Sequence, residues 1–334
     1  MSATRGVRLG ITGATGALGT EVLAALDAAR VPIAQLVAVA GERSLGAELE
    51  FQGALVSVAP ELPALHGLDL LINCAPAAVT PDIVRAALRA EVPCIDCSGA
   101  FAQRDEVPLA WAAAGERVAP APLLAAPVDA ALVWLPLLRA LAPLGAPAHV
   151  RSTILEGASA SGRAGIEALT GESLALFNSQ EPDEDEAQGP PLAFDCRPNS
   201  GPAADGGRAR EVALAAVLAR ALAPAPAISA RWIQVPVFVG QVCALTISWE
   251  RAVDAGEAAL LLAKAPGVEL WSADDEGPNL RAVAGRDVVV ASRPEPDAAS
   301  PGALFLWAAG DVLRLAAANA AALAAAWLPA RTAH

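Results

Sequence analysis

The chain has 334 residues, of which 54% are hydrophobic and 18% charged, enough to bury the cores of two domains. Its formal net charge of -13 at pH 7 repels nucleic-acid phosphates and anionic lipids. The composition therefore predicts a soluble globular protein whose partners are small molecules or proteins, and it argues against nucleic-acid and membrane-surface binding.

The five scattered cysteines and the lack of an apolar signal sequence predict a reduced, cytoplasmic protein. The most apolar stretch, residues 302–329, is mostly alanine and contains Asp311, Arg314 and Asn319. It therefore predicts a buried strand and helix rather than a membrane span. A single lysine, three histidines and no tyrosine leave few groups for acid–base catalysis.

The first part of the chain alternates strand and helix patterns. A β-branched run at residues 7–12 leads into a glycine turn and then into helical spacing over residues 20–30. Further elements are expected as strands at residues 35–40, 68–74 and 92–96 and as a helix at residues 80–90. This alternation predicts an α/β fold with a Rossmann-type, doubly wound parallel sheet.

The glycine turn has the spacing G-x-x-G-x-x-G, which lets the backbone bring a helix N-terminus up to a pyrophosphate. Because a strand precedes it and a helix follows, the turn favours a nucleotide site over a purely structural role. The expected cofactor-binding residues of the turn are Gly13, Thr15, Gly16, Ala17, Leu18 and Gly19. After the next strand come Arg43 and Ser44, whose guanidinium and hydroxyl suit an adenosine 2′-phosphate, so NADP is the predicted cofactor. The alternative for Arg43 is an ordinary surface arginine.

After residue 127 the pattern becomes that of an α+β domain. Its elements are expected as helices at residues 130–141, 161–177 and 210–222 and as strands at 149–156, 231–238, 244–250 and 287–291. The acidic run at residues 183–186 predicts a solvated loop rather than a metal site, because nothing fixes four adjacent carboxylates around one ion.

Cys94 and Cys97 have the C-x-x-C spacing of redox and zinc sites. They lie in a predicted strand, where residues three apart point to opposite faces. Two buried strand cysteines are therefore expected, and no metal site is predicted anywhere in the chain.

Taken in order, these segments resemble the aspartate-semialdehyde dehydrogenase family along almost the whole chain. The similar stretches are the glycine turn, residues 42–46 with 49–53, 95–101, 161–169, 193–198, 235–240 and the helix at 311–319. The resemblance implies a Rossmann-type NADP-binding domain of residues 1–127, completed by a C-terminal helix at 311–330. It also implies an α+β substrate and dimerisation domain of residues 128–310.

The family's reaction needs a cysteine thiolate that attacks the aldehyde, hydride transfer to NADP, and phosphate attack on the thioester. The resemblance places Asp129 at the position of that cysteine, and a carboxylate is a much poorer nucleophile. Glu156 stands in place of an orienting glutamine. Gln241 replaces the acid–base histidine, and Gln234 replaces the arginine that binds the substrate carboxylate.

Two further anion-binding positions also differ from the family. The phosphate-binding arginine corresponds to Ala102, with Arg104 nearby, and the helix at residues 210–214 lacks the family's lysine. Loss of nucleophile, base and anion binders together predicts a non-catalytic member that still binds NADP. In this respect the chain resembles a paralogue branch without the active-site cysteine.

The alternative is an active NADP-dependent semialdehyde dehydrogenase or reductase in which Asp129 or Glu156 supplies the proton. Replacement of the nucleophile by Cys196 or Cys243, or of the base by His149, would need a different geometry. The resemblance also implies a homodimer, and a heterodimer with an active paralogue stays open.

Overall fold

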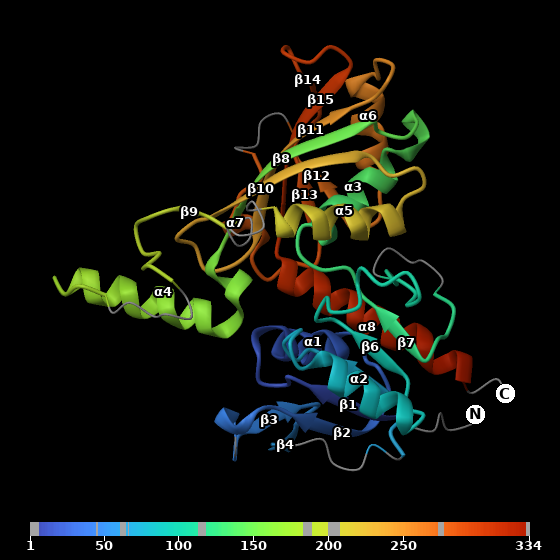
Figure 1. The fold of residues 1–334 in the computed structure, drawn as a ribbon, viewed down its shortest axis with the longest axis vertical. Helices are drawn as coiled ribbons and strands as arrows, with labels where there is room; N and C mark the ends of the chain where they lie inside the picture. The colour runs from blue at the N-terminus through green and yellow to red at the C-terminus, as the bar shows by residue number, and fades with distance from the viewer. Residues whose placement is uncertain are drawn as a thin grey trace. The chain divides into compact units, whose positions relative to one another are not determined.

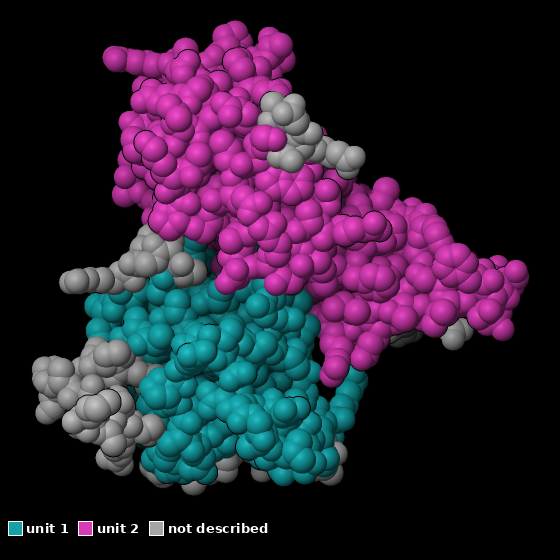
Figure 2. All heavy atoms as spheres, turned by 180° about the vertical axis from the view of Figure 1, so that it is seen from behind, with its two compact units in different colours: residues 1–128, 313–334 teal, residues 129–312 magenta. Residues whose placement is uncertain are grey.

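The computed structural model describes residues 7–44, 46–60, 65, 67–112, 118–182, 189–199, 208–272 and 277–331. The chain divides into two compact units, residues 1–128 with 313–334 and residues 129–312 (Figure 2). The first boundary between the two units follows Val128, and the boundary expected from the sequence follows residue 127. The acidic run at 183–186, expected as a loop, lies outside the described residues.

The first unit is built on a seven-stranded sheet in the order β3-β4-β2-β1-β5-β6-β7 (Figure 1). Its strands are β1 Val7–Thr12, β2 Ile33–Val39, β3 Glu48–Phe51, β4 Ala54–Ala59, β5 Leu70–Asn73, β6 Cys94–Asp96 and β7 Leu123–Ala125. Its helices are α1 Ala17–Ala28, the 3₁₀ helix η1 Glu42–Ser44, α2 Thr80–Arg89 and α8 Val312–Arg331.

The sequence predicts a fully parallel sheet, and this prediction is wrong at one edge. The strands from β4 to β7 pair in parallel, but β3 pairs antiparallel with β4. The reason is a two-residue turn at Gln52 and Gly53, whose φ angles of 50° and 76° make a tight hairpin. The Rossmann-type fold itself is confirmed.

Helices cover both faces of the first sheet and bury its apolar strands. On one face α1 and α8 contribute Leu26 and Ala320 to a core that includes Cys97, and on the other α2 contributes Val84 to a core that includes Cys94. The two cysteines therefore lie on opposite faces, as the spacing predicted. Every cysteine of the chain is a free thiol.

The second unit is built on an eight-stranded sheet in the order β12-β13-β15-β11-β8-β10-β9, with β14 beside β15 (Figure 1). Its strands are β8 His149–Glu156, β9 Arg197–Pro198, β10 Ala227–Gln234, β11 Gln241–Ser248, β12 Val268–Leu270, β13 Val289–Ala291, β14 Glu295–Pro296 and β15 Ala303–Gly310. Its helices are α3 Ala131–Ala140, α4 Gly162–Phe177, α5 Ala209–Ala221, α6 Ala255–Leu262 and α7 Leu280–Val283, with 3₁₀ turns η2 Ala142–Leu144 and η3 Ala158–Ser161.

Several boundaries differ from the expectations for local reasons. α1 begins at Ala17 rather than residue 20, because the left-handed Gly13 and extended Gly16 close the turn within four residues. β10 ends at Gln234 rather than residue 238, since Pro236 has no N–H to donate to a neighbouring strand. The apolar stretch after residue 302 is the expected strand and helix, β15 and α8. None of the described helices combines the length and hydropathy of a membrane span.

Candidate functional site

Three of the four expected site residues lie side by side in the second sheet. Glu156 ends β8 and is in register with Gln234 at the end of β10 and with Gln241 at the start of β11. Residues paired on neighbouring strands point to the same face, so the three side chains share one face. Their exposed fractions are 0%, 4% and 2%, respectively. Strand register thus joins positions that are far apart in the sequence.

Asp129, the fourth expected residue, is brought to this cluster by helix α3. That helix is apolar on every side and buried almost throughout, so it is fixed in the core of the second unit. Asp129 lies just before it with a left-handed φ of 57°, a conformation that aspartate tolerates better than most residues. Its side chain is 30% exposed and faces the buried Glu156 group.

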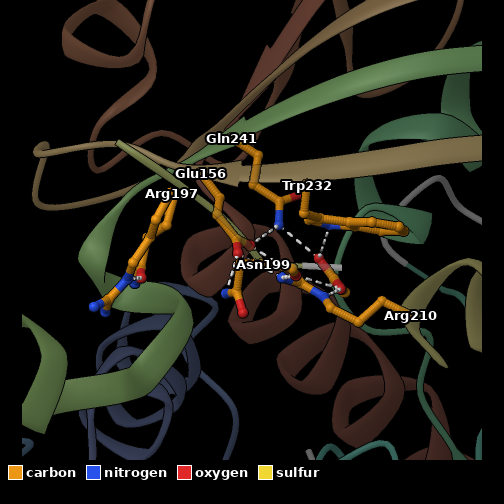
Figure 3. A network of polar contacts seen from close by, with 8 residues as sticks. Glu156, Arg197, Asn199, Arg210, Trp232 and Gln241 are labelled. Carbon is orange, nitrogen blue, oxygen red and sulfur yellow. Dashed lines mark hydrogen bonds and ion pairs between the residues drawn. The ribbon is translucent and has the colours of Figure 1, made fainter. Parts of the chain in front are cut away.

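The first turn of α5 adds Arg210, which binds both carboxylates (Figure 3). Arg210 Nη2 donates to Asp129 Oδ2 and to Glu156 Oε2, both at 2.7 Å. Its Nε donates to Asp129 Oδ2 at 3.1 Å and its Nη1 to Glu156 Oε1 at 2.5 Å. The guanidinium also stacks on the ring of Trp232, with Cζ 4.6 Å from the centroid. Arg210 is therefore the hub of the cluster.

The other hydrogen bonds to the carboxylates of Asp129 and Glu156 come from uncharged donors. Gln241 Nε2 donates to Asp129 Oδ1 at 2.5 Å and to Glu156 Oε2 at 3.2 Å. Asn199 Nδ2 donates to Glu156 Oε1 at 2.7 Å, and Trp232 Nε1 lies 3.4 Å from Asp129 Oδ1 (Figure 3). All four carboxylate oxygens thus accept hydrogen bonds. This is the pattern of a closed ion-pair network.

Burial lowers the pKa of the Arg210 guanidinium, but the hydrogen bonds with Glu156 and the charges of Asp129 and Glu156 outweigh it and raise that pKa above its usual range. Arg210 is therefore a permanent cation. Its charge offsets only one of the two carboxylates, which makes the cluster unsuited to the phosphate and carboxylate groups of an anionic substrate.

Gln234 is reached by a different arginine. Arg197, on the short edge strand β9, donates from Nε to Gln234 Oε1 at 3.0 Å. The labelled Arg197 and Arg210 side chains lie on different sides of Asn199 (Figure 3). Gln234 is thus part of the polar surroundings of the cluster, and no described hydrogen bond joins its side chain to Asp129.

The thiols and the histidine considered as substitutes lie elsewhere or are shielded. Burial raises the pKa of the Cys243 thiol to about 12, opposed by a hydrogen bond from Trp134 and reinforced by Asp129 and Glu156. Cys196 is exposed and precedes β9. His149 is at the opposite end of β8 from Glu156, roughly 23 Å away at the rise of a β-strand. No described hydrogen bond joins any of these three side chains to Asp129 or Glu156.

The central residue of the cluster, Arg210, is not among the site residues that the sequence predicts. The resemblance points to the helix at 210–214 only through the lysine that this helix lacks. An arginine in the first turn of a helix is unfavourable for the helix dipole, which is a detectable signal of nearby carboxylates. Trp232 and Asn199 carry no such signal, because they join the cluster only through the strand pairing of β10 and β9.

The expected nucleotide turn lies between β1 and α1 of the first unit and has the geometry of an anion cradle. A Cβ on Gly13 would lie 2.5 Å from the Cys74 carbonyl oxygen, and one on Gly19 would lie 2.1 Å from the Gly13 oxygen. α1 begins without a capping side chain or an acidic residue in its first turn, so its N-terminal N–H groups suit a pyrophosphate. Ala17 opens the helix, whereas Leu18 packs against the core.

The second expected cofactor segment lies beside this turn. Thr15 Oγ1 and Ser44 Oγ share a hydrogen bond of 2.7 Å, which ties η1 to the glycine turn. Arg43, in the same turn of 3₁₀ helix, is exposed. Ala102 is 1% exposed and Arg104 is exposed, so the buried position after Phe101 presents no guanidinium. Among the described residues, no group of three or more histidine, cysteine or acidic side chains could hold a metal ion.

Comparison with known proteins identifies the two units. Residues 8–119 match the semialdehyde dehydrogenase NAD-binding domain and residues 136–315 match the semialdehyde dehydrogenase dimerisation domain. The aspartate-semialdehyde dehydrogenase of Synechocystis sp. is 28% identical over 320 residues, covering 93% of this chain and 94% of that protein. That of Streptomyces akiyoshiensis is 29% identical over 332 residues, covering 93% and 95%.

Solved structures agree in fold. Aspartate semialdehyde dehydrogenase II from Vibrio cholerae has a TM-score of 0.88 at 24% identity and covers 98% of this chain and 99% of that one. A probable aspartate-semialdehyde dehydrogenase from Pseudomonas aeruginosa has a TM-score of 0.83 at 24% identity, with the same coverage. With both domain models matched in order along one chain, this protein belongs to the aspartate-semialdehyde dehydrogenase family and has a nicotinamide-nucleotide-binding domain.

Proposed function

We propose that this chain is a non-catalytic member of the family that binds NADP and does not oxidise aspartate semialdehyde. One observation carries the proposal: Asp129, which the resemblance places at the position of the family's cysteine, is held with Glu156 in an ion-pair network around Arg210. This arrangement supports a structural role for Asp129 rather than attack on a carbonyl carbon.

The chemistry of the surrounding side chains supports the proposal. Formation of an acyl-enzyme that phosphate can resolve requires a thiolate, and the nearby Cys243 thiol stays protonated at neutral pH. Gln241 contacts both carboxylates, but an amide neither gives nor takes a proton in this pH range. A mechanism with Asp129 or Glu156 as proton donor would therefore have no described partner to relay the proton.

The cofactor proposed here is NADP rather than NAD. The backbone of residues 13–19 and the N-terminus of α1 would hold the pyrophosphate, and Arg43 with Ser44 would hold the 2′-phosphate. In the family's reaction the nicotinamide accepts a hydride. We propose that this chain is itself a partner or regulatory protein. The nucleotide would then be a bound ligand and would accept no hydride.

We also infer a homodimer formed through the second unit. Alternate residues of the central strands, including Thr153, Arg231 and Trp307, are exposed on the sheet face opposite Glu156. Trp307 is 41% exposed, which is unusual for tryptophan on a free surface. The match to a dimerisation domain over the same strands supports this assignment, and the free thiols fit a reduced, cytoplasmic protein.

The test is an assay of the purified chain with aspartate semialdehyde, phosphate and NADP, followed through NADPH absorbance, beside a fluorescence titration with NADPH. We expect saturable NADPH binding and no turnover above an Asp129→Ala control. An active family enzyme serves as the positive control. Phosphate-dependent turnover that disappears in Asp129→Ala would overturn the proposal, and absence of NADPH binding would remove its cofactor part.

A further inference from the structure

A second site is indicated in the first unit, at the edge of the sheet opposite the glycine turn. A cavity of about 410 Å³ lies where the chain enters β6 and β7, beside the end of α2 and the last turns of α8. Pro93 and Pro122 directly precede the two strands, and Leu88 and Trp327 line the cavity from the helices. Its volume is within the range of small-molecule pockets.

The wall of this cavity is apolar and poor in charge. Val92 and Trp327 are buried, Leu88 is partly exposed, and the proline residues supply no N–H donors. Among the described residues that line it, Glu91 is the one ionisable residue. An anionic ligand would meet no cation among these residues and would be repelled by Glu91, so phosphates and carboxylates are disfavoured.

Trp327 gives the cavity a specific polar feature. The side chain is only 7% exposed, and its Nε1 is a buried donor with no hydrogen-bond partner within the part of the chain that the structure describes. Buried N–H groups without a partner are rare, because the desolvated donor is left uncompensated. The same indole belongs to the apolar core formed by α8 and lines the cavity. A hydrogen-bond acceptor that enters the cavity would satisfy the group.

We propose that this cavity binds a small, uncharged, largely apolar molecule with a carbonyl or ether oxygen, which accepts a hydrogen bond from Trp327 Nε1. The apolar wall holds the hydrocarbon part and the indole N–H selects the oxygen. The site lies at the amino ends of β6 and β7, whereas the glycine turn follows the carboxyl end of β1, so both sites can be filled at once.

Nuclear magnetic resonance of the full chain labelled with ¹⁵N-tryptophan tests the proposal. The seven tryptophans give separate indole N–H signals, and Trp327→Phe identifies one of them by its loss. Cyclohexanone is titrated as the ketone probe, and methylenecyclohexane, which has the same shape without the oxygen, is the matched control. We expect a saturable downfield shift of the Trp327 signal in the millimolar range with cyclohexanone only.

A second variant makes the result independent of the folding of Trp327→Phe. Leu88 is 43% exposed, so Leu88→Glu places a charge in the wall at a position that tolerates it, and we expect cyclohexanone affinity to fall about tenfold. NADPH affinity should stay unchanged, which separates this site from the cofactor site. An equal shift with both probes, no saturable shift, or unchanged affinity in Leu88→Glu would each overturn the proposal.

Discussion

Arg210 Nη2 lies 2.7 Å from Asp129 Oδ2, although the two residues are 81 positions apart in the sequence. The Asp129 carboxylate is therefore one half of an ion pair. Glu156, fully buried, completes the arrangement from the centre of the sheet. Removing one partner of such a network leaves the opposite charges buried without a counter-charge. The resulting loss of stability makes the structural role of the network measurable.

Arg210→Met should destabilise the protein by about 3 kcal/mol, because two carboxylates would lose their shared cation. The matched control is Arg208→Met, which removes an arginine that is 59% exposed and leaves Glu211 bonded to Arg231. We expect less than about 1 kcal/mol from the control. Urea unfolding followed by circular dichroism measures both. Equal effects would show that the cluster does not hold the second unit together.

Glu211 should make part of the stability pH-dependent. Burial raises the pKa of its carboxyl, but hydrogen bonds from the Ala230 N–H, Arg208 and Arg231 outweigh burial and lower it below the usual 4.5. A lowered folded-state pKa stabilises the protein above the unfolded pKa, and this contribution disappears as pH falls through the folded value. The wild type should therefore exceed Glu211→Gln in unfolding free energy by the largest amount at about pH 6. This difference should shrink below about pH 4.5. A difference that stayed constant over this range would contradict the assignment.

Cys243 should resist alkylation in the native protein. Its side chain is 0% exposed, and a thiol with a pKa of about 12 has almost no thiolate at pH 8. Cys196 is exposed and serves as the internal control. Iodoacetamide treatment followed by peptide mass spectrometry should label Cys196 first and Cys243 only after denaturation. Rapid native labelling of Cys243 would reopen its role as a nucleophile.

Gly19→Ala should weaken NADPH binding more than about tenfold, because the added methyl would overlap the Gly13 carbonyl oxygen and displace the turn from the phosphates. Gly41→Ala is the control, since a Cβ there meets no atom within 4 Å. Fluorescence titration measures the two affinities, and thermal unfolding checks that Gly19→Ala is folded. Wild-type affinity in folded Gly19→Ala would place the cofactor elsewhere.

Arg43→Ala should separate NADP from NAD. Loss of a charge-assisted contact to the 2′-phosphate is expected to weaken NADPH binding about tenfold, while NADH binding stays the same. Parallel titrations of both nucleotides with both proteins give the comparison. If NADPH and NADH affinities fell together, Arg43 would be stabilising the turn rather than reading the phosphate.

Local pattern predicted much of the fold. β8 has the expected bounds, 149–156, because alternation of buried and exposed residues runs through its whole length. The glycine turn is predictable because Gly16 and Gly19 lie against the Gly13 carbonyl oxygen within the same turn, although Gly13 itself lies against the distant Cys74 backbone. The sequence does not predict the β3–β4 hairpin, since Gln52-Gly53 is a less common turn pair than Asn-Gly and both strands are partly exposed.

The amino-acid sequence by itself determined the fold class and the order of the two units, because these follow from local periodicity and from the order of the motifs. Only the tertiary structure decided which side chains contact Asp129 and Glu156. Register brings Glu156, Gln234 and Gln241 together, and the packing of α5 on that sheet face places Arg210 between Asp129 and Glu156. Such contacts depend on strand pairing and helix packing between distant segments, which leave no periodic signal in the chain.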